Sequence, residues 1–203
     1  MSGIGSLWRR ALNLTILLLI LLVLSASLNL YMHLRLRLMR SLITNIGYTP
    51  HGLWRPPGDE APELAAKRLD GSPVVIDPKA SKLPTVIYVF SPRCSWCDRN
   101  LENVKALARA STGHFAFVGL ALRSTDLQNY LAESDLGFEV FMEPTWRTLV
   151  DYGLGATPTT IIVTPRGRIQ AVWQGAYIDR TAREIEAFFD IRLPGLRDSQ
   201  TFH

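Results

Sequence analysis

The sequence of 203 residues has few of the side chains that staple small folds together or bind structural metals. It contains two cysteines and four histidines. Two cysteines cannot form a disulfide-stapled scaffold, so any importance they have must be chemical. Structural zinc needs four ligands, and three of the histidines (His33, His51 and His203) lie in predicted anchor, linker or tail segments. We therefore expect no metal site.

Negative charge is absent from the first part of the chain. All 18 acidic residues lie at or after Asp59. Five of the 22 basic residues flank an uncharged apolar stretch near the amino terminus, namely Arg9, Arg10, Arg35, Arg37 and Arg40. The other 17 basic residues nearly balance the acidic ones, so the remaining chain has no basic excess for nucleic acid. We expect no nucleic-acid partner.

Residues 11–30 carry no charge and are rich in leucine. Twenty such residues are long enough to cross a bilayer as a helix, which predicts a retained membrane anchor that contacts lipid. A cleaved secretory signal is the alternative, with Trp8-Arg9-Arg10 before the apolar run and a small-residue cleavage site at 25–27. The flanking arginines are nearly balanced, so they leave the orientation open.

Composition divides the chain into four parts. Residues 1–49 are the predicted anchor and its flank, and residues 50–60 a linker rich in proline and glycine. Residues 61–198 are the predicted folded domain, long enough for a single core. Residues 199–203 are the predicted tail.

The folded domain is expected to alternate strands and helices. Thr85–Phe90 is almost entirely β-branched or aromatic, which is typical of a strand buried on both faces. Further strands are expected at 73–76, 114–122, 138–142, 159–164 and 169–174. One helix is expected to begin at 91–92, and two more are expected over 126–136 and 145–152. A last helix is expected to follow a cap at Asp179. This order predicts an α/β fold with a mixed sheet and helices on both faces.

Cys94 and Cys97 form a CxxC motif where the predicted buried strand meets a helix. The first sulfur then lies at the helix N-terminus, where unpaired N–H groups and the helix dipole stabilise a thiolate. Arg93 adds a neighbouring positive charge, and Trp96 is a candidate for surface recognition or for packing over the helix start. We expect Cys94 to be the exposed nucleophile and Cys97 the buried resolving thiol. Their redox-active disulfide would replace any cofactor.

Thr157 and Pro158 immediately precede a predicted strand. A proline that enters a strand lacks the N–H for a ladder hydrogen bond. A cis bond at this place would leave the preceding backbone free to pair with an extended peptide beside the sulfurs. Thr157 and Pro158 therefore join the two cysteines as candidate site residues.

These features together resemble the thioredoxin superfamily over roughly residues 62–192. More narrowly, the chain is similar to the membrane-anchored TlpA/ResA-like thiol–disulfide oxidoreductases, which share the anchor and an extra strand–helix insertion, here placed around 124–142. The run Phe90-Ser91-Pro92-x-Cys94 is also similar to accessory disulfide proteins of methylamine dehydrogenase maturation.

The resemblance implies a thioredoxin-like fold held at the bacterial inner membrane by one pass, with its domain in the periplasm. It implies a reductase of protein disulfides that acts through the Cys94/Cys97 dithiol. The implied partners are protein thiol or disulfide substrates and a membrane or periplasmic electron donor that restores the dithiol.

The chain also departs from the family pattern. Several relatives carry a glutamate three residues after the second cysteine, where this chain has Asn100, so Glu139 or Glu143 would have to supply that acid. A peroxidase is disfavoured because Ile87 stands where its proline should be. A copper chaperone would have a CxxxC spacing, one residue longer than here. A binding module whose disulfide never turns over, or a metallochaperone, remains the alternative function.

Overall fold

The computed structural model describes part of the amino-terminal region and nearly all of the domain, namely residues 16, 18–32, 34, 35 and 55–197. The chain divides into two compact units, Met1–Tyr48 and Thr49–His203. In the first unit the described residues are helical and exposed. Within the described residues, no helix is both long and apolar enough to cross a membrane. Parts of the predicted anchor (11–15 and 17), residues 50–54 of the linker and the tail 199–203 lie outside them.

The second unit is built on a seven-stranded mixed sheet. Its strands are β1 (Leu64–Lys67), β2 (Pro73–Ile76), β3 (Thr85–Phe90), β4 (Ala116–Ala121), β5 (Glu139–Met142), β6 (Thr159–Val163) and β7 (Ile169–Gln174). Their order across the sheet is β2-β1-β5-β4-β3-β6-β7. The pairs β3–β4 and β4–β5 are parallel, and the other neighbours are antiparallel.

Strand β3 lies in the middle of the core, and all six of its residues are buried. Val86, Tyr88 and Phe90 pack in one core cluster, while Ile87 and Val89 pack in another. Successive side chains of a strand point to opposite faces, so the two clusters lie on the two faces of the sheet. The prediction of a strand buried on both faces is confirmed.

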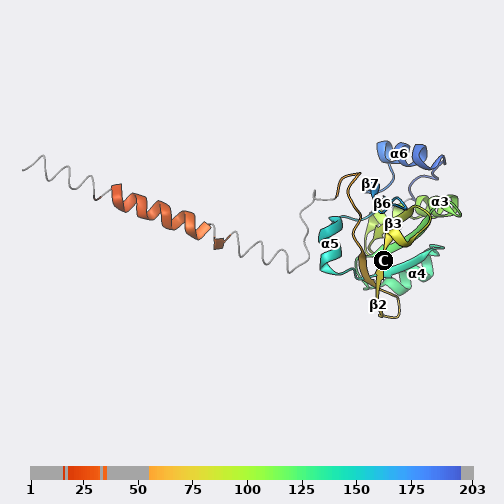
Figure 1. Cartoon of the computed structure of the whole chain (residues 1–203), viewed down its shortest axis with the longest axis horizontal. Helices are drawn as coiled ribbons and strands as arrows, with labels where there is room; N and C mark the ends of the chain where they lie inside the picture. The colour runs from red at the N-terminus through yellow and green to blue at the C-terminus, as the bar shows by residue number, and fades with distance from the viewer. Residues whose placement is uncertain (1–15, 17, 33, 36–54, 198–203) are drawn as a thin grey trace, which may run out of the picture. The chain divides into compact units, whose positions relative to one another are not determined.

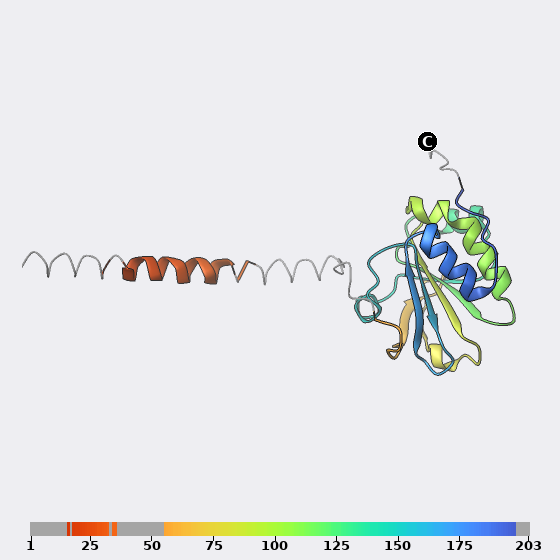
Figure 2. The same cartoon turned by 90° about the horizontal axis from the view of Figure 1, so that it is seen from above.

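Helices cover both faces of the sheet. They are α2 (Ser95–Arg99), α3 (Leu101–Ser111), α4 (Leu127–Ser134), α5 (Trp146–Tyr152) and α6 (Asp179–Phe189), with a short 3-10 turn at Pro78–Ala80. Helices α3 and α6 lie together on one side of the sheet, and α5 lies on the other (Figures 1 and 2). This confirms the predicted α/β class with a mixed sheet.

Two local predictions were wrong. The helix after β3 begins at Ser95 and not at residue 91, because Pro92 belongs to the turn that precedes it. Asp179 is the first residue of α6 and not its cap; Ile178 occupies the N-cap and makes no side-chain cap hydrogen bond. Asn100, with φ −85° and ψ −1°, separates α2 from α3.

The backbone joins the sheet earlier than the predicted domain start. Gly58 donates its N–H to the carbonyl of Ile169 at 2.7 Å, and Ala61 donates to the carbonyl of Gly167 at 2.8 Å. The end of the proline- and glycine-rich segment is therefore hydrogen-bonded to the β6–β7 hairpin.

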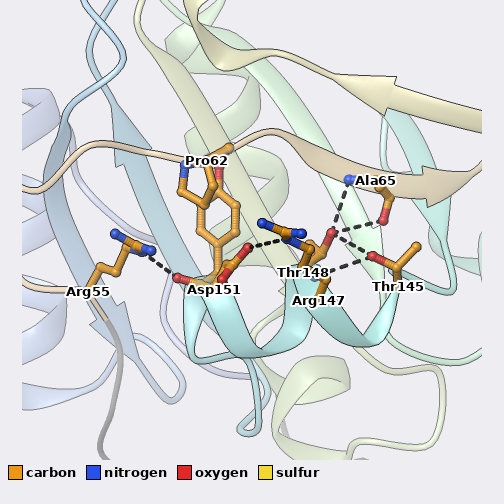
Figure 3. A network of polar contacts seen from close by, with 8 residues as sticks. Arg55, Pro62, Ala65, Thr145, Arg147, Thr148 and Asp151 are labelled. Atoms are coloured by element: carbon orange, nitrogen blue, oxygen red, sulfur yellow. Dashed lines mark hydrogen bonds and ion pairs between the residues drawn. The ribbon is translucent and has the colours of Figure 1, made fainter.

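Helix α5 fixes this incoming segment and β1 through side chains on one face (Figure 3). The Thr148 hydroxyl accepts the N–H of Ala65 at 3.0 Å and donates to the Ala65 carbonyl at 3.1 Å. The Tyr152 hydroxyl donates to the Pro62 carbonyl at 2.5 Å. These contacts hold β1, a strand that the sequence pattern did not predict.

We expect Thr148→Val to destabilise the domain by about 1–3 kcal/mol, because it leaves the part-buried N–H of Ala65 without its partner, whereas the Ala65 carbonyl keeps the N–H of Thr145. Urea unfolding of the purified chain measures the change. Arg147→Ala is the matched control on the same helix, since the Arg147 side chain is 83% exposed and makes one ion pair, with Asp151. An equal effect of the two substitutions would contradict this account of β1.

Candidate functional site

The chain turns sharply from β3 into α2 and places Cys94 at the N-cap of the helix. After Phe90 the backbone forms a turn, in which the N–H of Cys94 donates a hydrogen bond to the Ser91 carbonyl at 3.0 Å. Cys94 keeps an extended backbone (φ −91°, ψ 107°), so its sulfur accepts the N–H of Cys97 at 3.2 Å. The sulfur therefore takes the place of a capping oxygen at the helix N-terminus.

The two cysteines are free thiols with opposite environments. Cys94 is half-buried, whereas Cys97 is fully buried in the core. Burial, together with the hydrogen bond to Cys94, raises the pKa of the Cys97 thiol far above its usual range. Cys97 thus keeps its proton at neutral pH.

The surroundings of Cys94 lower the pKa of its thiol to about 6. The main cause is the hydrogen bond from the Cys97 side chain, to which Thr157 and the backbone N–H groups of Cys97 and Trp96 add. Partial burial of Cys94 opposes them and raises the pKa. The negative charge therefore rests on the accessible sulfur, which is the one that can attack.

Thr157 and Pro158 lie against this sulfur. Their peptide bond is cis, as the sequence analysis anticipated. The Thr157 carbonyl accepts a hydrogen bond from the protonated Cys94 thiol at 3.4 Å. Pro158 is buried and Thr157 half-buried. The structure thus brings together Cys94, Cys97 and the Thr157-Pro158 pair.

The side chains of Arg93 and Trp96 flank the sulfurs, and no hydrogen bond or ion pair joins either side chain to a sulfur among the described residues. The Arg93 Nε lies 2.7 Å from Oδ2 of Asp126, so its charge is matched by a carboxylate. The Trp96 ring is 46% exposed, and the Arg99 guanidinium carbon lies 4.7 Å from its centre. An aromatic surface bordered by a cation therefore adjoins the motif.

A groove of about 560 Å³ opens beside Cys94. Hydroxyl and guanidinium groups line it, from Ser91, Arg93, Ser95, Arg123, Thr125 and Thr157. Arg123 and Thr125 were not predicted from the sequence. They follow β4, the parallel neighbour of β3, and the carboxyl ends of parallel strands meet at one edge of a sheet. These two residues could have been predicted only if the parallel pairing of β3 and β4 had been known.

Neither Glu139 nor Glu143 takes the place of the glutamate that Asn100 replaces. The Glu143 carboxylate bonds to the Lys67 ammonium at 2.8 Å, which lowers its pKa, and Glu139 is exposed on β5. Neither is among the groups that act most strongly on the pKa of Cys94 or Cys97. Within the described part of the chain, no three His, Cys, Asp or Glu residues are grouped so that they could hold a metal ion.

Comparison with known proteins agrees with this fold. The model of the AhpC/TSA family matches residues 57–172, more than half of the chain. The methylamine utilization protein MauD of Methylorubrum extorquens is 27% identical over 147 residues, which cover 71% of this chain and 68% of MauD. The similarity to disulfide proteins of methylamine dehydrogenase maturation, first seen in residues 90–94, thus extends over most of the domain.

Two solved structures show the same fold. The thioredoxin domain of a thiol–disulfide oxidoreductase from Bacteroides vulgatus has a TM-score of 0.55 at 20% identity, covering 66% of this chain and 99% of that one. A peroxiredoxin-like protein from Aquifex aeolicus has a TM-score of 0.52 at 16% identity, covering 67% and 89%. The domain is therefore thioredoxin-like, and its chemistry has to be argued from its own site.

We expect the alkylation rate of Cys94 to rise with pH through about 6 and then level off, because the thiolate is the reactive form. In Cys97→Ala the midpoint moves up towards the ordinary cysteine value of about 8.5, since the donated hydrogen bond is lost. The measurement is the rate of reaction with iodoacetamide over a pH series.

Cys97→Ser is the matched control, because its hydroxyl can still donate to the Cys94 sulfur. Its midpoint should fall between those of the parent and Cys97→Ala. An unchanged midpoint in Cys97→Ala would show that the buried thiol does not control the charge on Cys94.

Proposed function

Since the chain belongs to the AhpC/TSA family, we propose that it is a thiol–disulfide oxidoreductase that reduces protein disulfides in the periplasm from a membrane anchor. One observation carries the proposal: a half-exposed Cys94 with a pKa of about 6 stands directly over a protonated, buried Cys97. Two cysteines with a purely structural role would not need one thiolate and one protonated thiol. An attacking cysteine must be a thiolate, and the cysteine that resolves the mixed disulfide must wait as a protonated thiol.

The reaction follows from that polarity. The Cys94 thiolate attacks a substrate disulfide, one substrate thiolate leaves, and a mixed disulfide forms. Cys97 then loses its proton and attacks the Cys94 sulfur, which releases the second substrate thiolate. The substrate gains two electrons, and Cys94–Cys97 is left as a disulfide. A dithiol electron donor in or near the membrane returns the pair to its reduced state.

The substrate is expected to bind as an extended segment beside Thr157. Its backbone can pair there because Pro158 leaves the preceding residue outside the sheet ladder. Arg123, which is exposed in the groove, offers a positive charge to residues that flank the substrate cysteine.

The pKa of Cys94 supports the reducing direction. A lower pKa of the attacking cysteine stabilises the dithiol and makes the protein a stronger oxidant. A pKa of about 6 is closer to the value of about 7 in thioredoxin than to about 3.5 in the oxidant DsbA. We therefore propose the reductase direction.

The proposed anchor rests on the sequence of residues 11–30, and the proposed periplasmic location rests on the resemblance to the membrane-anchored TlpA/ResA-like oxidoreductases. The stretch is uncharged, and its described residues are helical with exposed apolar side chains. Exposed apolar surface of this kind favours a lipid environment. A tether would keep the Cys94 site near substrates and donors at the membrane.

Trapping in cells tests this function. We expect Cys97→Ser to accumulate mixed disulfides between Cys94 and substrate proteins, because the resolving thiol is gone. The adducts should appear in the membrane fraction on non-reducing gels and vanish on reduction. Cys94→Ser, which removes the nucleophile, is the matched control and should give none.

Other outcomes of the experiment would point elsewhere. Stable partner binding by Cys94→Ser, with no adducts from Cys97→Ser, would indicate a binding module without turnover. Stoichiometric oxidation of Cys94 by hydrogen peroxide, with no protein adducts, would indicate a peroxidase. Adducts confined to the soluble fraction would contradict the anchored form of the proposal.

A further inference from the structure

The groove beside Cys94 contains a cation whose charge no described residue balances. The groove has a volume of about 560 Å³, and its lining includes two arginines, Arg93 and Arg123. Arg93 is matched, because its Nε lies 2.7 Å from the carboxylate of Asp126. The Arg123 side chain is exposed and takes part in no ion pair or hydrogen bond with another described residue. The groove therefore carries a net positive charge beside the reactive sulfur.

A further carboxylate lies close to this segment, but a lysine already balances it. Glu143 accepts a hydrogen bond from the hydroxyl of Ser124, the residue that follows Arg123. The same carboxylate forms an ion pair with the Lys67 ammonium at 2.8 Å. This ion pair and that of Arg93 are both neutral as pairs, so the unmatched charge is that of Arg123.

The sheet places Arg123 and Thr157 on the two sides of Cys94. Arg123 follows β4, which pairs in parallel with β3. Thr157 precedes β6, which pairs with the other edge of β3. Cys94 follows β3 itself, between these two neighbours, and all three residues line the groove. A substrate whose backbone lies along Thr157 therefore turns its opposite side towards Arg123.

The groove also offers hydroxyl groups that can bind a carboxylate. The hydroxyls of Ser91, Ser95 and Thr125 belong to its lining, and none of them is hydrogen-bonded to another residue in the part of the chain that the structure describes. A hydroxyl can donate to a carboxylate oxygen, and a guanidinium can donate two parallel N–H groups to a carboxylate. An apolar or cationic side chain would use neither kind of donor.

We propose that the substrate carries an acidic side chain next to its disulfide, and that Arg123 is the residue that selects it. The inference rests on the proposed function and names the class of protein disulfide that the site reduces. The covalent steps stay the same: the substrate disulfide gains two electrons, and the Cys94–Cys97 pair loses them. The substrate carboxylate forms an ion pair with Arg123, and no covalent bond to it forms or breaks.

The exposure of Arg123 sets the size of the effect. An ion pair between exposed groups changes an equilibrium by a small factor, roughly two- to fivefold. Salt weakens such an interaction, because the screening length is about 10 Å at 0.1 M ionic strength. We therefore expect a preference of this size at low salt, and its loss as salt is added.

The experiment uses the reduced full chain and three short peptides, each with one cysteine and each oxidised to a disulfide-linked dimer. The cysteine is flanked on both sides by glutamate in the first peptide, by glutamine in the second and by lysine in the third. Alkylation measures the rate at which the protein loses its free thiols. Each rate is divided by the rate of dithiothreitol with the same peptide, which removes the intrinsic reactivity of the disulfide.

The parent protein should prefer the acidic peptide. At low salt we expect its normalised rate with the glutamate peptide to exceed that with the glutamine peptide roughly two- to fivefold. The lysine peptide should be the slowest. Arg123→Gln should lose this preference, and Arg123→Lys should keep most of it, because lysine retains the charge. Asp126→Asn should increase it, because Arg93 then becomes a second unmatched cation.

Arg166→Gln is the matched control. Arg166 is likewise exposed and without an ion pair or hydrogen bond to a described residue. It lies in the turn between β6 and β7, at the opposite end of β6 from Pro158. Its loss changes the net charge of the protein as much as the loss of Arg123 does. The preference of Arg166→Gln should equal that of the parent protein.

An unchanged preference in Arg123→Gln would overturn the inference. An equal fall in Arg123→Gln and Arg166→Gln would also overturn it, because it would show attraction by the net charge of the whole protein. Equal normalised rates of the parent with all three peptides would overturn it as well, while leaving the reductase intact. If the parent reduces none of the peptides, the proposed function fails instead, so the two failures are distinguishable.

Discussion

Burial of Cys97 beneath Cys94 is the constraint on which the site depends. In the core, Cys97 is held as a neutral thiol, and its hydrogen bond stabilises negative charge on the half-exposed Cys94. The buried strand β3 and the tight turn after Phe90 bring this about, because they place one sulfur at the start of α2 and the other a turn further in. The location of a single proton thus decides which cysteine attacks.

Among the described residues, no carboxylate is one of the groups that act most strongly on the pKa of Cys97. A carboxylate near Cys97 would raise the energy of a Cys97 thiolate but could also accept its proton. This chain has Asn100 instead, with Glu143 paired to Lys67 elsewhere. The groove side of the site carries charge through Arg93, Arg123 and Asp126.

Local patterns in the sequence were sufficient for much of this arrangement. Thr85–Phe90 could be predicted as a doubly buried strand because its residue types allow little else. The CxxC spacing and Thr157-Pro158 located the candidate site, since each is a short local signal. The predicted membrane span at 11–30 and the periplasmic location remain predictions.

What could not be predicted depends on contacts between distant residues. The strand β1 has the unremarkable sequence LAAK and is held by β2 and by Thr148, 83 residues away from Ala65. The structural role of Asn100 comes from the backbone N–H of Tyr177, 77 residues away. Arg123 joins the groove only once β3 and β4 are known to be parallel neighbours.

The most direct test of the account is a redox titration of the purified chain in glutathione buffers, with the free thiols trapped by alkylation. We predict that Cys94 and Cys97 oxidise together, in one two-electron transition, to an internal disulfide. The midpoint should lie near the thioredoxin value of about −270 mV. A midpoint near about −120 mV would contradict the reductase assignment, and failure to form the internal disulfide would contradict the exchange mechanism itself.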